Sequence, residues 1–107
     1  MFSHPQCLST KATKELRNQA GAWLRELREN CGLTQRDLAA KVGAEHYTLI
    51  SQLETGRIRI KPDRYLVWAT ALNVEPQEFV RTLMSYYDPM TYEILFGTKV
   101  QKSQKQP

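Results

Sequence analysis

Residues 34–56 read TQRDLAAKVGAEHYTLISQLETG, and this stretch decides the fold. Its apolar residues form two sets with helical spacing: Leu38, Ala39 and Val42, then Ile50 and Leu53. Gly43 stands between the sets and suits the positive φ that a sharp corner between helices often requires. The pattern predicts two short amphipathic helices joined by a tight turn. Because helices of about nine residues are unstable alone, other parts of the chain must supply a core.

The side chains left on the surface of this stretch are polar. They are Glu45, His46, Tyr47, Thr48, Ser51 and Gln52. A short, rigidly held helix with hydrogen-bonding side chains at its amino end has the shape of a DNA recognition helix. An ordinary polar helix face gives the same pattern, so these residues alone leave both interpretations open.

Length and composition predict one domain with a modest core. Of the 107 residues, 41% are hydrophobic and 24% are charged, values typical of a globular chain rather than a disordered one. No apolar run approaches the roughly 18 residues of a membrane span. The amino terminus also lacks the apolar core of a signal peptide. We therefore expect a cytoplasmic protein with no membrane partner.

The cysteines and histidines show no metal-binding pattern. Cys7 and Cys31 are far apart, and His4 and His46 are the only histidines. This spacing supports neither a disulfide framework nor a zinc site, so we expect no metal and no cofactor. Cys31 is expected to be a small buried hydrophobe.

The part of the chain before residue 34 is predicted to be a flexible N-terminal arm at residues 1–12, followed by a helix from about Thr13. The apolar stripe of this helix consists of Leu16, Ala20, Trp23, Leu24, Leu27 and Cys31. Gly21 leaves open whether the two halves of the helix are continuous. Gly32 is the expected carboxy-terminal cap.

After Gly56, the segment RIRIKP predicts an extended loop that ends at Pro62. A helix with the stripe Tyr65, Leu66, Trp68, Ala69 and Leu72 follows, and Asn73 ends it. A further helix begins near Glu75, with the stripe Phe79, Val80, Leu83, Met84 and Tyr87. The main domain therefore covers residues 13–87. Residues 88–97 form a short extra segment, helix or strand, and residues 98–107 a disordered basic tail.

From Trp23 to Phe79 the chain resembles the XRE family, the Cro and lambda-repressor-like helix-turn-helix regulators. The resemblance rests on LRELRENCGLTQRDLAAKVG (24–43), ISQLETG (50–56) and ALNVEPQEF (71–79). It implies an all-α, five-helix lambda-repressor-like DNA-binding domain with the helix-turn-helix at its second and third helices. It also implies a bacterial or phage regulator of transcription that binds double-stranded DNA and is associated with the nucleoid.

One departure from the family affects the register of the recognition helix. The interval from Gly43 to Gly56 is one residue longer than usual in the family. Aligning back from Gly56 places His46 at the amino cap of the recognition helix and Thr48 just inside it. Aligning forward from Gly43 shifts each role by one. We prefer the first alignment because it keeps Ile50 in the core.

With the flanking pattern included, the polar face is interpreted as base-reading. The expected base contacts are Tyr47, Thr48, Ser51 and Gln52. Glutamine can bond adenine through two hydrogen bonds, and threonine offers a hydroxyl and a methyl group. The expected phosphate contacts are Gln35, Arg36, His46, Arg57, Arg59 and Lys61. A similar glutamine contacts phosphate in the family, which implies that role for Gln35. The basic residues after Gly56 supply the electrostatic attraction, with a solvated run of charge as the alternative.

A homodimer is expected, because one such module covers only a few base pairs. Two-fold pairing matches a palindromic operator with half-sites about 10 bp apart. The expected interface consists of Val80, Leu83, Met84, Tyr87, Tyr92, Leu95 and Phe96. A last segment that folds back on its own domain is the alternative.

Two functions therefore stay open at this stage. The first is a sequence-specific transcriptional regulator. The second is a protein-interaction module, an antitoxin-like partner or an RNA polymerase adaptor, that uses the C-terminal segment. The sequence has no Ser/His/Asp grouping and no glycine-rich phosphate loop, so we do not expect an enzyme.

Overall fold

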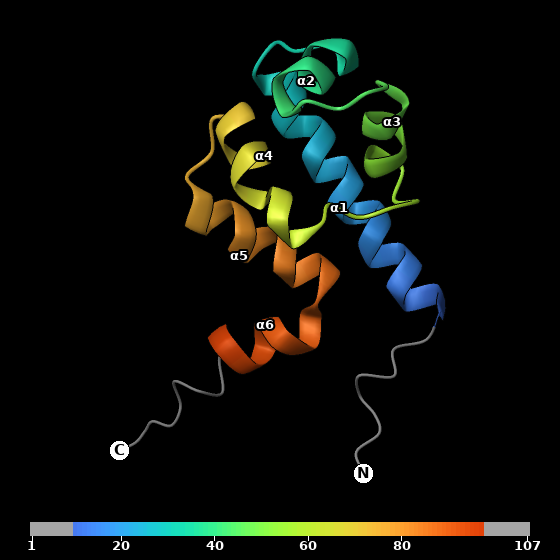
Figure 1. Ribbon diagram of the computed structural model, residues 1–107. Helices are drawn as coiled ribbons and strands as arrows, with labels where there is room; N and C mark the ends of the chain where they lie inside the picture. Colours follow the sequence, from blue (N-terminus) through green and yellow to red (C-terminus); the bar gives the residue numbers. More distant parts are fainter. Residues whose placement is uncertain (1–9, 98–107) are drawn as a thin grey trace.

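Six α-helices account for most of residues 10–97, the part of the chain that the computed structural model describes (Figure 1). In chain order they are α1 (Thr10–Asn30), α2 (Gln35–Val42), α3 (Thr48–Glu54), α4 (Tyr65–Ala71), α5 (Pro76–Tyr87) and α6 (Pro89–Phe96). A single 3-10 turn, Pro62–Arg64, leads into α4. The described residues contain no strand, so the expected all-α fold is confirmed.

The first helix is longer than the sequence predicts. It begins at Thr10, so residues 10–12 belong to α1 and not to the predicted arm. The rest of that arm and the predicted tail lie outside the described residues. α1 also continues without a break through Gly21. A Cβ added there would lie 2.3 Å from the carbonyl oxygen of Glu54, so this glycine lets the end of α3 contact the α1 backbone.

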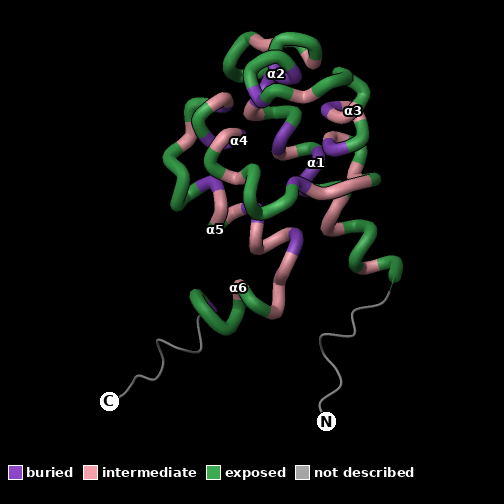
Figure 2. The backbone as a smooth tube through the Cα atoms, viewed as in Figure 1, coloured by how far each residue is buried: buried purple, intermediate pink, exposed green. Residues whose placement is uncertain are grey.

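The core surrounds α1, which packs against α3 and against α5 (Figures 1 and 2). The buried apolar residues are Ala20, Leu24, Leu38, Ala39, Val42, Ile50, Leu53, Ile60, Trp68, Ala69, Leu72, Phe79, Leu83 and Tyr87. The ring of Trp23 stacks on that of Phe79, with 5.5 Å between ring centroids. Every core position predicted on α2 and α3 is buried, so the two amphipathic helices predicted within residues 34–56 are confirmed.

Two predictions of buried residues are wrong. Leu66 is 63% exposed. It lies roughly 110° around α4 from the middle of the buried face formed by Trp68, Ala69 and Leu72, so neighbouring helices leave it largely uncovered. Cys31 is exposed as well. It lies past the last residue of α1, in a turn where its Sγ donates to the carbonyl oxygen of Leu72 at 3.1 Å.

The C-terminal segment, which the sequence left open between helix and strand, is the helix α6. It follows α5 at Asp88 and packs on that helix, where the guanidinium of Arg81 lies 4.9 Å from the centroid of the Phe96 ring. No residue of α6 is buried. Ile94 and Leu95 are 73% and 56% exposed, so one face of α6 is apolar and uncovered within the described chain.

Candidate nucleic-acid interface

The amino end of α2 is closed by the predicted capping box. The hydroxyl of Thr34 accepts a hydrogen bond from the backbone N–H of Asp37 at 3.0 Å, and the Asp37 carboxylate accepts one from the Thr34 N–H at 2.9 Å. The hydrogen bond from the Thr34 backbone N–H, together with the nearby Thr34 hydroxyl, favours the ionised carboxylate and lowers the pKa of Asp37. The capping box therefore satisfies backbone groups at the start of α2 through contacts within four residues of chain.

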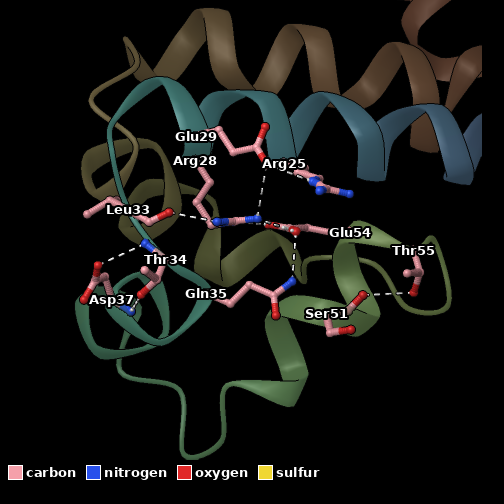
Figure 3. Close-up of polar contacts among 10 residues, drawn as sticks. All are labelled: Arg25, Arg28, Glu29, Leu33, Thr34, Gln35, Asp37, Ser51, Glu54 and Thr55. Carbon is pink, nitrogen blue, oxygen red and sulfur yellow. Dashed lines mark hydrogen bonds and ion pairs between the residues drawn. The ribbon is translucent and has the colours of Figure 1, made fainter.

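A buried network ties α1, α2 and α3 together (Figure 3). The guanidinium of Arg28, on α1, donates through Nε to Glu54 at 2.6 Å and through Nη1 to the carbonyl oxygen of Leu33 at 2.8 Å. The amide of Gln35 donates to the same Glu54 carboxylate at 3.1 Å. The hydrogen bond to Glu54 raises the pKa of Arg28. The phosphate contact of Gln35 stays a prediction, but one amide hydrogen is already used inside the domain.

The turn between α2 and α3 follows the expected left-handed corner at Gly43, where φ is 73°. The α-helix itself begins at Thr48, one residue later than the preferred alignment implies. His46 still closes the first turn, because its carbonyl oxygen accepts from the N–H of Leu49 at 3.2 Å. The added residue of the turn is thus taken up before α3, and Ile50 remains fully buried.

The outer face of α3 carries the predicted base-contacting residues. Thr48 and Gln52 are exposed, Tyr47 is 42% exposed and Ser51 is half-buried. The guanidinium of Arg36, on α2, lies 4.3 Å from the centroid of the Tyr47 ring. This contact places a predicted phosphate-contacting residue against a predicted base-contacting one.

The basic run after α3 divides into two kinds of residue. Arg57 and Lys61 are exposed and form no ion pair within residues 10–97. Arg59, by contrast, pairs with Asp88 at 2.7 Å and lies 4.5 Å from the centroid of the Tyr87 ring. The hydrogen bond to Asp88 raises the pKa of Arg59. The phosphate contact predicted for Arg59 would require this guanidinium to leave its partner, and nothing in the sequence near residue 59 indicates that partner.

The structure corrects two of the expected interface residues. Leu83 is completely buried and Tyr87 is 8% exposed, because the buried face of α5 repeats every four residues from Phe79. They pack in the domain's own core and are not available to a second subunit. Val80, Met84 and Tyr92 are half-buried, while Leu95 and Phe96 are exposed.

The charged residues that hold this surface in place were not predicted from the sequence. Arg28 is buried at 8% exposure, and its position four residues after Leu24 on the buried face of α1 was an available signal. Glu54 and Asp88 gave no comparable signal. Their partners lie 26 and 29 residues away in the chain, so only the tertiary fold brings them together.

Two further observations concern the described residues alone. Residues 10–97 contain no group of three or more His, Cys, Asp or Glu side chains that could hold a metal ion. None of their helices is long and apolar enough to span a membrane.

The second and third helices of an all-α domain, joined by a tight left-handed corner and presenting a polar outer face, define a helix-turn-helix protein. The family model described as helix-turn-helix matches residues 24–79, more than half of the chain, and the protein therefore belongs to the XRE family of helix-turn-helix regulators. It is a DNA-binding regulator of transcription. No curated protein matches the chain.

Proposed function

We propose that the protein recognises a specific DNA sequence by placing α3 in the major groove. The observation that carries this proposal is the buried Arg28–Glu54–Gln35 network, which fixes α3 against α1 and α2 with its polar face outward. In this position Thr48 and Gln52 contact base edges. Arg57 and Lys61, which lack ion-pair partners among the described residues, contact phosphates on either side.

The protein acts as a homodimer on a palindromic operator, with no catalytic step of its own. Support comes from the exposed Ile94 and Leu95 of α6 and from a groove of about 400 Å³ that residues of α5 form with Phe96. A second copy that covers this face would remove apolar surface from water. The revised interface excludes the two buried residues of α5 and contains Val80, Met84, Tyr92, Ile94, Leu95 and Phe96.

In vitro selection of bound sequences tests the base contacts. The variant Thr48→Ala/Gln52→Ala is expected to lose sequence preference, whereas Arg57→Ala/Lys61→Ala weakens binding to every sequence alike. Gln19→Ala, an exposed glutamine on α1, serves as the matched control for Gln52→Ala. Unchanged preference in the first variant would rule out α3 as the base-reading helix.

Sedimentation of the full chain tests the dimer. Leu95→Glu is expected to give monomers that bind a half-site normally and a palindrome without cooperativity. Thr70→Glu, at an exposed polar position of α4, adds the same charge away from α6 and leaves the dimer intact. The same apolar face also supports a second candidate, an adaptor that binds another protein through α6. A monomeric wild-type chain without sequence preference would favour the adaptor.

A further inference from the structure

A second basic surface lies beside the end of α3, where the first turns of α1 meet Gly56 and Arg57. A hollow of about 430 Å³ is lined by Thr10, Thr13, Lys14, Arg17, Gly56 and Arg57. The four residues from α1 are spaced at i, i+3, i+4 and i+7, so they share one face of that helix. Three of the lining residues are cations, two carry hydroxyl groups and none is acidic. We call this surface the α1 hollow.

Backbone packing fixes the position of the hollow. Gly56 has a φ of 80°, and a Cβ on it would lie 2.6 Å from Oδ1 of Asn18 and 3.0 Å from the carbonyl oxygen of Arg17. Only glycine fits this close approach at this φ. The next residue, Arg57, is therefore anchored beside Arg17. The three cations meet because two backbones are pressed together, and not because long side chains happen to reach each other.

The cations of the hollow have no ion-pair partner among the residues that the structure describes. The ion pairs within residues 10–97 join Arg25, Arg28 and Arg59 to Glu29, Glu54 and Asp88. Lys14, Arg17 and Arg57 take part in none of them. Like charges held close together repel each other, and a bound anion removes that repulsion. The two threonine hydroxyls are donors that also suit phosphate oxygens.

We propose that the α1 hollow binds a phosphate of the DNA backbone just outside the segment read by α3. This inference rests on the proposed function and extends its site to Thr13, Lys14 and Arg17. The ligand is DNA phosphate because Arg57 directly follows the turn that ends α3. In Figure 1 the amino end of α1 also projects past the end of α3 on the same side of the molecule. Lys14 and Arg17 precede the family-matched residues 24–79.

Salt-dependent binding of the full chain to a single half-site tests the proposal. For Lys14→Ala/Arg17→Ala, the slope of log K against log salt is expected to become shallower by about two, with affinity lowered about tenfold or more and sequence preference unchanged. The hydroxyl-radical footprint on that half-site shortens at one end. The single variant Lys14→Ala, at an exposed position, is expected to give about half the change in slope even if Arg17→Ala alters folding.

Arg25→Ala is the matched control for Arg17→Ala, because it removes the same charge two turns further along α1, outside the hollow. Equal effects of Arg17→Ala and Arg25→Ala would overturn the proposal, since net charge alone would then explain both. The proposed function is judged separately by Thr48→Ala/Gln52→Ala. If Lys14→Ala/Arg17→Ala keeps both the full footprint and the sequence preference, only the proposed phosphate contact at the α1 hollow is wrong. If the wild-type chain shows no sequence preference at all, the proposal that α3 reads DNA is wrong.

Discussion

Arg28 and Glu54 join the first and third helices through two hydrogen bonds, from Nε to Oε2 at 2.6 Å and from Nη2 to Oε1 at 3.1 Å. Their side chains are only 10% and 5% exposed, so neither charge can turn to water if the other is removed. The pair thus sets the position of α3 on the domain, and the geometry of the DNA-binding surface depends on it.

Removal of the Glu54 carboxylate leaves the Arg28 guanidinium buried without its close partner, because the Glu29 carboxylate lies 4.0 Å from Nη2. We expect Glu54→Ala to lower the free energy of unfolding by about 3–5 kcal/mol. Glu29→Ala removes an acid from the exposed pair with Arg25 and is expected to cost no more than about 1 kcal/mol. Urea denaturation followed by circular dichroism measures both. Similar losses in the two variants would contradict the assigned role of the buried pair.

Gly21 offers a case in which helix propensity and packing predict opposite results. Alanine favours a helix over glycine by about 1 kcal/mol, yet the added Cβ would lie 2.3 Å from the backbone oxygen of Glu54. We expect Gly21→Ala to lower stability by about 1–3 kcal/mol, because α3 must move away from α1. Ala22→Gly, at the exposed neighbouring position, reports the propensity effect alone. A higher melting temperature for Gly21→Ala would show that the two backbones are not in contact.

The capping box predicts how stability depends on acid. Hydrogen bonds from Thr34 lower the pKa of Asp37 in the folded chain. The ionised Asp37 carboxylate therefore contributes fully to stability above its pKa in the unfolded chain, roughly 3.9. That contribution is lost as pH falls through the lower pKa that Asp37 has in the folded chain. Asp37→Asn is therefore expected to flatten the loss of stability below about pH 4. Thr34→Ala is expected to cost about 1 kcal/mol at neutral pH. A pH series of thermal unfolding curves checks both statements, and an unchanged acid limb in Asp37→Asn would contradict the first.

Tyr87 makes the stability of the folded chain depend on pH in the alkaline range. Burial raises its pKa above the ordinary value of 10.0, so the unfolded chain ionises first. Its contribution to stability is complete below about pH 10 and is lost as pH rises through the folded pKa. Tyr87→Phe removes this alkaline dependence. It also leaves the N–H of Ile60, which donates to the Tyr87 hydroxyl at 3.2 Å, without that acceptor, at a cost of about 1–3 kcal/mol. Unfolding curves of Tyr86→Phe, where the neighbouring tyrosine is half-buried, provide the comparison; equal alkaline limbs in the two variants would contradict this role.

Those features of the fold that depend on local spacing were predictable from the sequence. Leu38 and Val42 stand at i and i+4, and Ile50 and Leu53 at i and i+3, so each pair shares a helix face wherever the helices lie. All four are buried. The caps at Thr34 and Gly43 depend on backbone preferences within a few residues. Such signals survive without knowledge of the tertiary fold.

The features that were predicted wrongly, or not predicted at all, depend on contacts between segments far apart in the chain. Leu66 and Leu83 are both apolar helix residues, and only the packing of α4 and α5 decides that the first is exposed and the second buried. Arg59 looked like part of a free basic run until the fold brought Asp88 to it. The α1 hollow could not be foreseen either, because it depends on Gly56 meeting the backbone of Arg17.

The central position of α1 has a consequence for hydrogen exchange. Its middle turns, from Ala20 to Leu24, are covered by α3 on one side and by α5 on the other, so their amide protons can exchange only when the whole domain opens. The first turn, from Thr10 to Lys14, contains no buried residue and lies before the backbone contact of Arg17 with Gly56, so it can fray without disturbing the core. One continuous helix thus combines the slowest-exchanging amides of the domain with some of its fastest. A phosphate held by Lys14 and Arg17 would slow exchange in the frayed turn while leaving the middle turns unchanged.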